Sequence, residues 1–267
     1  MKKKTVHKNQ TKSFQQGKQN IAKLTVTNHI RGDGFAYLVL ILLSFIIYSN
    51  TLSFDYALDD SMIITKNKFT QDGIKDFKDI MTNDAFTGFF GKQRKLVAGG
   101  RYRPLSQLMF AVEKDIFGNK PFAGHLINVI LYVLSIVLIY KTLKLLFKTV
   151  KSDRWWFSIP FIASVLFAVH PIHTEVVANI KSRDEILSLL FAFLCLYYSL
   201  LFIDKKKTIF LVVSGISMFL GLLSKENAIT FLAIIPLCYY MFRKPVASEY
   251  LISIFPLILA LSMVLMN

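Results

Sequence analysis

Long apolar runs are the feature that most limits what this chain can fold into. The first, Phe35–Phe54, holds 20 residues without a charge. A helix of this length, rising about 1.5 Å per residue, would cross the roughly 30 Å hydrocarbon core of a bilayer. Six further runs follow: Pro121–Tyr140, Trp155–Lys181 (with an apolar part that ends near Val169), Ile186–Ile203, Thr208–Ser224, Asn227–Phe242 and Tyr250–Met266. The pattern predicts an all-α, polytopic membrane protein with about seven transmembrane helices.

The segment before the first run sets the domain limits. Residues 1–34 carry eight Lys or Arg and one acid, Asp33, without a sustained apolar period, a composition typical of disorder. The run that follows is longer than the hydrophobic part of a signal peptide and has no cleavage motif after it, so we interpret it as a retained anchor. We therefore expect a disordered basic cytoplasmic tail over 1–34 and a transmembrane domain over 35–267.

Charge is distributed unevenly between the two sides that this topology creates. The net charge of +15 would by itself suggest nucleic acid or an anionic membrane surface as partner. With a cytoplasmic N-terminus, the cytoplasmic segments hold 18 basic and four acidic residues, and the opposite side holds 14 basic and 13 acidic residues. This positive-inside pattern indicates topology rather than a ligand. The tail also lacks interleaved aromatic residues, so we expect no nucleic-acid binding.

One connection, Asp55–Lys120, is far too long for a simple link between helices. Two of its stretches have helical spacing, DGIKDFKDIM and RPLSQLMFAVEKDIFG, and Pro104 suits the first position of the second helix. The first stretch places four apolar residues on one face: Ile74, Phe77, Ile80 and Met81. The second has an apolar stripe of Leu105, Leu108, Met109, Val112 and Ile116. Both are suited to the membrane interface, and we expect function to be concentrated in this external helical loop, 55–120.

Two adjacent acids, Asp59 and Asp60, follow the first run closely. Adjacent carboxylates at a membrane boundary repel each other and are costly to desolvate, so one should have a raised pKa. Such a carboxylate can act as a general base toward an alcohol or help to bind a cation; a solvated loop start is the alternative.

Further along, the paired Arg101 and Arg103 suit a phosphate or diphosphate, with anchoring to lipid headgroups as the alternative.

The stretch HPIHTEVVANIKSRDE holds a second set of titratable residues: His170, His173, Glu175, Lys181, Arg183, Asp184 and Glu185. His170, His173 and Glu175 have donor atoms suited to a metal. Pro171 interrupts helix geometry, however, and the pattern H-E-x-x-H does not occur. Hydrogen-bonded structural histidines are therefore the preferred interpretation. Lys225, in LLSKENAIT, has the setting of a solvated turn but would face the same side as Asp59.

Four segments in this order resemble the transmembrane-and-TPR O-mannosyltransferase family and its bacterial relatives, within the GT-C glycosyltransferase superfamily. The segments are YSNTLSFDYALDDSMIITKN, YRPLSQLMFAVEKDIFGNKPFAGHLINVILY, LFAVHPIHTEVVANIKSRDEILSLLF and LLSKENAIT, and they cover most of the chain from Tyr48 to Ala233. The resemblance implies transfer of a mannose-like sugar from a polyprenyl-phosphate donor to a hydroxyl of a protein or glycan acceptor, on the non-cytoplasmic face.

The resemblance also implies site residues. GT-C enzymes place an acid just after the first span, which makes Asp59 or Asp60 the candidate base. Glu175 matches the Glu of the family's second external loop and is a further catalytic candidate. Six residues are candidates for contact with the donor: Arg101, Arg103, Arg183, Lys225, His170 and His173. The resemblance establishes no cofactor, and a divalent cation is the candidate that it leaves open.

Family members have more spans and commonly a C-terminal TPR region, so we expect this chain to be the N-terminal part of a larger fold. Two alternatives come from other functional classes. A transporter or lipid flippase is disfavoured because the apolar runs carry no charge in their interior, and a non-catalytic membrane scaffold is the other. Short loops, Lys/Ile/Phe-rich usage and the lack of outward-facing glycosylation motifs favour a bacterial inner membrane over the endoplasmic reticulum.

Overall fold

The described part of the chain is built of helices. The structure, a computed structural model, describes residues 33–57, 59–92, 101–150, 152 and 154–265, and within these ranges there is no strand. The predicted all-α membrane fold is confirmed. Residues 1–32 of the predicted tail lie outside the described residues, and Asp33 and Gly34 already belong to the first helix.

Three helices are long and apolar enough to cross a membrane. They are the N-terminal helix Asp33–Ser53, α6 Pro121–Leu146, and Ile180–Lys205, in which a 3-10 turn leads into α9 Arg183–Lys205. Shorter apolar helices occupy the other predicted runs: α7 Ile159–Ala168, α10 Thr208–Ser224, α11 Phe231–Phe242 and α12 Ala247–Leu265. Each of the seven predicted runs thus contains a helix, and within the described residues three of these helices are both long and apolar enough for a span.

The third run shows why α7 is short. The helix begins after Ser158, whose Oγ accepts a hydrogen bond from the backbone N–H of Phe161 at 3.4 Å. Pro160 lies in its first turn, where a missing N–H has no intrahelical partner to lose. The helix ends at Ala168, shortly before His170 and Pro171, because proline disfavours a helical residue in front of it. A separate short helix, α8 His173–Ala178, follows.

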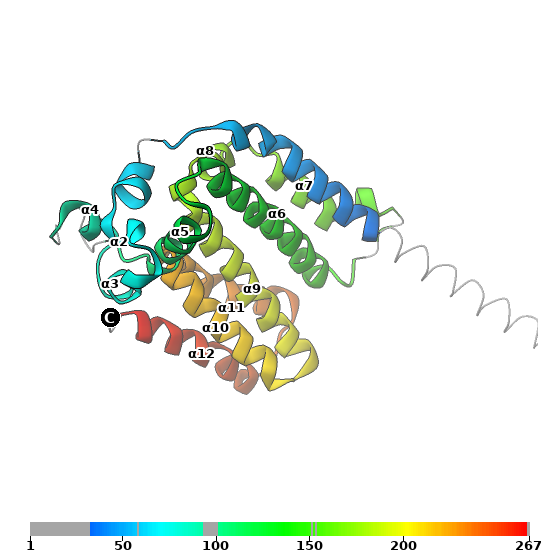
Figure 1. Ribbon diagram of the computed structural model, residues 1–267. Coiled ribbons are helices and arrows are strands. Elements are labelled where there is room, and N and C mark those ends of the chain that lie inside the picture. The colour runs from blue at the N-terminus through cyan, green and yellow to red at the C-terminus, as the bar shows by residue number, and fades with distance from the viewer. Residues whose placement is uncertain (1–32, 58, 93–100, 151, 153, 266–267) are drawn as a thin grey trace, which may run out of the picture.

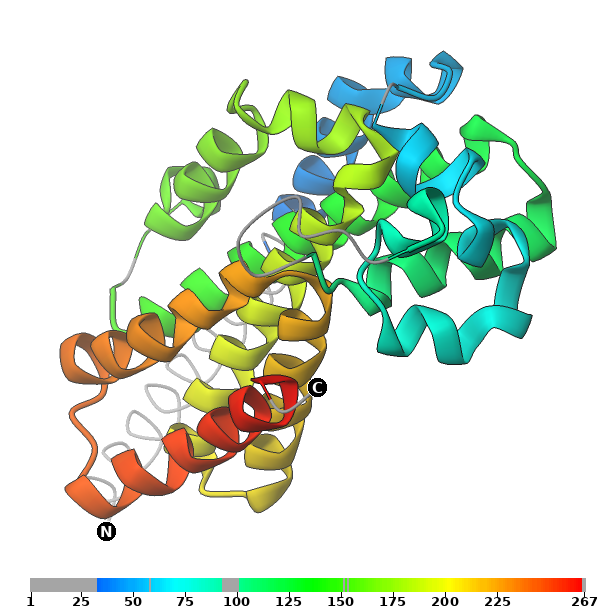
Figure 2. The ribbon, with the colours of Figure 1, turned by 90° about the vertical axis from the view of Figure 1, so that its left-hand side faces the viewer.

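α9 lies in the middle of the bundle, between two apolar clusters. On one side it packs with α10, α11 and α12 around Met218 and Ile235. On the other side the N-terminal helix, α6 and α7 pack around Leu40 and Ile136, and α9 contributes Ile186. Figures 1 and 2 show the two groups of helices on either side of α9.

The long connection folds into a small helical subdomain. Its helices are the π-helical turn Ser61–Thr65, α2 Lys68–Gln71, the 3-10 turn Gly73–Asp76, α3 Phe77–Thr82, α4 Thr87–Phe90 and α5 Pro104–Phe117. Their apolar side chains form a third core around Ile63, Phe86 and Phe110. Ile180 joins this core from the bundle, so the subdomain is packed directly against the start of the α9 segment.

The two predicted loop helices are present with changes. The stretch 72–81 is divided into the 3-10 turn and α3, because the backbone of Asp76 leaves the helical region between them, with φ −90° and ψ 22°. At the start of the turn the N–H of Ile74 donates to Asp115 on α5 at 2.9 Å. Pro104 begins α5 as predicted. The face of α5 that is buried holds Ser106, Gln107, Phe110 and Ala111, and the predicted apolar stripe lies on its more exposed side.

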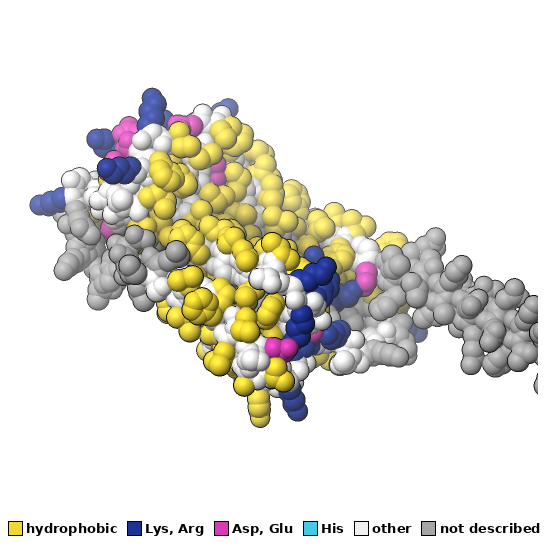
Figure 3. Space-filling view, turned by 90° about the horizontal axis from the view of Figure 1, so that it is seen from below, with side chains coloured by type: hydrophobic (Ala, Val, Ile, Leu, Met, Phe, Trp, Pro, Cys, Tyr) yellow, Lys and Arg dark blue, Asp and Glu magenta, His cyan; other side chains and the backbone are white. Residues whose placement is uncertain are grey.

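The bundle has two chemically different ends because successive helices alternate in direction. We call the end that carries the loop subdomain, α8 and the α10–α11 connection the loop end. The end with the α6–α7, α9–α10 and α11–α12 connections is the basic end. In Figure 3 an apolar surface lies between an end with mixed acidic and basic side chains and an end where Lys and Arg gather.

Candidate active site

The two acids that follow the first helix have different surroundings. Asp60 is fully buried, and its carboxylate accepts hydrogen bonds from the backbone N–H groups of Ala57 and Lys181, both at 2.7 Å. The side chain of Asp59 is 58% exposed and lies 3.6 Å from the Nζ of Lys181. Lys181 is therefore held through its backbone by one acid and through its ammonium group by the other. Asp59 is the acid that is open to a ligand.

Burial raises the pKa of Asp60, and its two backbone hydrogen bonds and the nearby His125 oppose this shift. Repulsion by Asp59 adds a smaller upward contribution. The raised pKa expected for one member of the pair thus falls on Asp60, and its main cause is lost hydration rather than the neighbouring charge.

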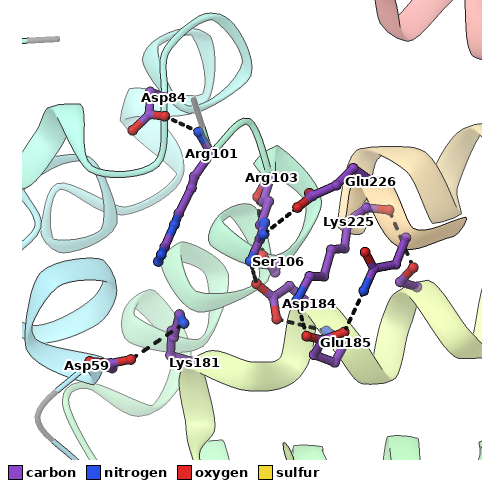
Figure 4. Close-up of polar contacts among 12 residues, drawn as sticks. Asp59, Asp84, Arg101, Arg103, Ser106, Lys181, Asp184, Glu185, Lys225 and Glu226 are labelled. Carbon is purple, nitrogen blue, oxygen red and sulfur yellow. Dashed lines mark hydrogen bonds and ion pairs between the residues drawn. The ribbon is translucent and has the colours of Figure 1, made fainter. Parts of the chain in front are cut away.

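Lys181 lies on the wall of a cleft between the loop subdomain and the start of α9. We call it the cationic cleft, and its lining residues are Ile63, Ala85, Phe86, Arg101, Arg103, Ser106, Gln107, Lys181 and Asp184. Three of these residues are cations and one is an acid, so the cleft favours an anion. Figure 4 shows Arg101 extending toward Lys181, which Asp59 contacts from another side.

Arg101 lines this cleft with a guanidinium group that pairs with no acid among the described residues. Its backbone N–H donates to the carboxylate of Asp84, which fixes the main chain. Its guanidinium lies over the ring of Phe86, 4.9 Å from the ring centre. Within the described ranges no carboxylate pairs with this guanidinium. Its planar set of N–H donors therefore remains suited to a phosphate.

Arg103 ties the loop subdomain to two parts of the bundle. It donates to Asp184 at the start of α9 at 2.5 Å, and to Glu226 after α10 at 2.8 Å. Beside it, the ammonium group of Lys225 pairs with Glu185. These contacts bring together three segments that are far apart in the sequence (Figure 4). They position the cleft wall formed by Arg103 and Asp184.

Arg183 lies inside the protein. It is fully buried, and its guanidinium stacks over the ring of Phe110 at 4.4 Å. Its Nε donates to Asn128 at 2.8 Å and its Nη2 to the carbonyl oxygen of Gly124 at 3.1 Å, while Nη1 pairs with Glu113. All three nitrogens thus have internal partners, and Arg183 joins α5, α6 and α9.

His170, His173 and Glu175 are not among the residues that line the cationic cleft. The exposed His170 accepts the backbone N–H of Ile172 on its Nδ1 at 3.2 Å. His173 packs on Phe167, with ring centres 4.3 Å apart, and burial, followed by the charge of His170, lowers its pKa. Glu175 is exposed. In the described part of the chain, no group of three His, Cys, Asp or Glu side chains is arranged to hold a metal.

Buried amides hold the cleft wall, and sequence reasoning gave them no role. Gln107 donates to the Oδ1 of Asn67 at 3.1 Å. The amide of Asn67 in turn donates to the carbonyl oxygens of Met62 at 2.9 Å and Ala85 at 2.8 Å. In the sequence, only the polar pair Ser106 and Gln107, on the side of α5 opposite its apolar stripe, could have indicated these buried amides.

Comparison with known proteins assigns this chain to a family. Residues 103–267 match the family model described as dolichyl-phosphate-mannose-protein mannosyltransferase. The chain belongs to this mannosyltransferase family. The matched region includes Arg103, Asp184, Lys225 and Glu226, whereas Asp59 precedes it.

Several relatives of this mannosyltransferase-family chain are protein O-mannosyl-transferases. It is 32% identical over 195 residues to F38B6.6 of Caenorhabditis elegans, covering 72% of this chain and 27% of that protein. It is 34% identical over 164 residues to human TMTC1 (61% of this chain, 17% of that protein) and 35% identical over 162 residues to human TMTC2 (60% and 18%). The chain thus spans about a quarter or less of the length of these relatives. No solved structure matches it significantly.

Proposed function

We propose that this mannosyltransferase-family chain forms the core of a GT-C-type membrane glycosyltransferase. It would move a mannose-like sugar from a polyprenyl-phosphate donor to a hydroxyl of a protein or glycan acceptor. The observation that carries the proposal is the exposed Asp59 carboxylate beside a cleft lined by three cations. Such a site can take up a proton while a phosphate group leaves. The names of the relatives support the same chemistry.

Asp59 is the proposed general base. The acceptor hydroxyl oxygen attacks the anomeric carbon of the donor sugar and forms the new glycosidic bond. The bond between the anomeric carbon and the phosphate oxygen breaks, and polyprenyl phosphate leaves with the bonding electron pair. The hydroxyl proton passes to the carboxylate of Asp59. The ammonium group of Lys181 lies 3.6 Å from this carboxylate and holds it at the edge of the cleft.

Arg101 and Lys181 are the proposed ligands of the donor phosphate. Negative charge accumulates on the phosphate as the bond to the sugar breaks, and fixed cations stabilise that charge. Arg103 stands on the same wall, held by Asp184 and Glu226. Lys225 acts on the cleft indirectly, through its pair with Glu185, the neighbour of Asp184.

Asp60 is proposed as a positioning residue rather than as the base. It is buried, and its two backbone hydrogen bonds fasten the turn that carries Asp59 to the segment that carries Lys181. The mechanism does not use Arg183, whose partners are internal. It also gives no step to His170, His173 or Glu175, which are not part of the cleft.

We further propose that the loop end faces the non-cytoplasmic side of a bacterial inner membrane and that the N-terminus is cytoplasmic. The described residues of the basic end include nine basic and three acidic side chains, and those of the loop end include 12 basic and 13 acidic side chains. Cytoplasmic connections are the ones enriched in Lys and Arg. A cysteine-accessibility experiment in intact cells tests this orientation.

The test of the catalytic proposal is Asp59→Asn in the full-length protein, assayed with a polyprenyl-phosphate mannose and a peptide containing Ser and Thr. We expect transfer to fall by at least about 100-fold, as for loss of a general base, with donor binding retained. Asp79→Asn, which changes an exposed carboxylate on α3, is the matched control and should transfer at the normal rate. Normal transfer by Asp59→Asn would falsify the assignment.

A further inference from the structure

The acids of the basic end are all neutralised within the described residues. Asp33 pairs with Lys144 at 2.5 Å, and Glu249 pairs with Lys206 at 2.5 Å. Asp204 pairs with both Lys148 and Arg243, each at 2.8 Å. The four cations in these pairs are therefore occupied, and no further acid of this end lies within the described residues.

Five exposed cations of the basic end have no carboxylate partner in the part of the chain that the structure describes: Lys141, Arg154, Lys205, Lys207 and Lys244. Three of these lie over aromatic rings. Lys141 is 4.9 Å from the ring centre of Tyr197, Arg154 is 5.6 Å from Trp156, and Lys205 is 5.6 Å from Phe210. These contacts hold cationic groups close to apolar surface.

Exposed apolar side chains border the same cations. Phe157 is 75% exposed, Ile209 59% and Val246 62%, and each lies two or three residues from one of the five cations. A soluble polyanion would leave these apolar side chains in water. A phospholipid would cover the apolar side chains and the cations together, because its acyl chains contact the apolar residues while its headgroup contacts Lys and Arg. Exposed Trp156 beside Arg154 is also typical of a membrane interface.

We infer that the basic end binds the headgroups of anionic phospholipids through Lys141, Arg154, Lys205, Lys207 and Lys244. The sequence assigned the positive charge to topology alone, whereas the structure separates the paired cations from those that are free for a ligand. This inference does not depend on the transferase proposal. Figure 3 shows Lys and Arg gathered at this end of the apolar surface.

The test compares two triple variants of the full chain. In the first, Lys141→Gln, Lys205→Gln and Lys207→Gln are combined. In the matched control, Lys68→Gln, Lys75→Gln and Lys78→Gln remove the same charge from exposed positions of the loop subdomain. Short-chain phosphatidylglycerol and phosphatidylcholine are titrated onto each detergent-purified protein. Binding is measured, and the rise in thermal midpoint is recorded as a second readout.

We expect the wild type and the control variant to prefer phosphatidylglycerol. The basic-end variant should bind it roughly 10- to 100-fold more weakly, given a modest contribution from each cation. Equal binding of the two lipids by the wild type, or equal losses in both triple variants, would overturn the inference. Tight binding of glycerol phosphate, which has no acyl chains, would show a free-anion site instead.

Salt provides a measurement that needs no variant. Binding of phosphatidylglycerol to the wild type should weaken as ionic strength rises, because exposed charges are screened within about 10 Å at 0.1 M salt. Binding that is independent of salt would contradict the inference even if the basic-end variant did not fold.

Discussion

At each end of the bundle an arginine whose side chain is at most 6% exposed joins neighbouring helices, but the charges around the two arginines are arranged differently. Arg183 at the loop end pairs with Glu113 and donates to the carbonyl oxygen of Gly124. Arg243 at the basic end pairs with Asp204 and donates to the carbonyl oxygen of Leu145 at 2.6 Å. Each links helices through one carboxylate and one main-chain oxygen.

Several other charged side chains pair with one another at the loop end, whereas several cations at the basic end are exposed and have no acidic partner within the described residues. Arg103 and Lys181 pair with carboxylates at the cationic cleft, whereas Lys205 and Lys207 are exposed. The length of the connections explains this difference. The long loop folds back over the helix ends and encloses a site, and the two-residue link between α9 and α10 has no chain with which to do so.

The largest expected effect tests whether Arg183 and Arg243 contribute equally to stability. Arg183→Met leaves Glu113, whose side chain is 13% exposed, without its ion-pair partner and should destabilise the protein by about 3–5 kcal/mol. Arg243→Met should cost less, because Asp204 keeps its contact with Lys148. Thermal midpoints in detergent measure both. The double change Arg183→Met, Glu113→Gln should recover part of the loss, and no recovery would contradict the ion-pair explanation.

A smaller effect is expected for the tether of the loop subdomain. Arg103→Gln releases Asp184 and Glu226, so the cleft wall should shift and transfer should fall roughly 10- to 100-fold. Limited proteolysis should cut the loop faster. Lys148→Gln, which removes an exposed cation from the basic end, should leave transfer unchanged. A similar loss of transfer activity in both variants would contradict the proposal that the loop end, and not the basic end, holds the active site.

The smallest effect concerns pH. The folded state raises the pKa of Asp60 above its unfolded value, so between the two values it binds more protons than the unfolded state. This contribution to stability is complete below the unfolded pKa and is lost as pH rises through the folded pKa. The difference in thermal midpoint between wild type and Asp60→Asn should therefore narrow as pH increases from about 4. If the difference in thermal midpoint widened instead, burial would not be the main influence on the pKa of Asp60.

Much of the fold was predictable, and part of the candidate site was not. The apolar runs predicted helices because burial in lipid depends on local composition and length. Pro104 predicted the start of α5 for an equally local reason. The contact between Asp59 and Lys181 had no such signal, since the two residues are far apart in the sequence and meet only after the loop has folded. The internal position of Arg183 was hidden for the same reason.

By itself the sequence determined the membrane helices, the alternation of their ends, and the acid pair next to the first span. These follow from hydropathy, charge and spacing along the chain. Only the tertiary structure decided which acid is buried, which arginine is enclosed and which cations stay free. Each of these depends on whether a partner from a distant segment reaches the side chain, because a charge is stable in the interior only when it is paired and hydrogen-bonded.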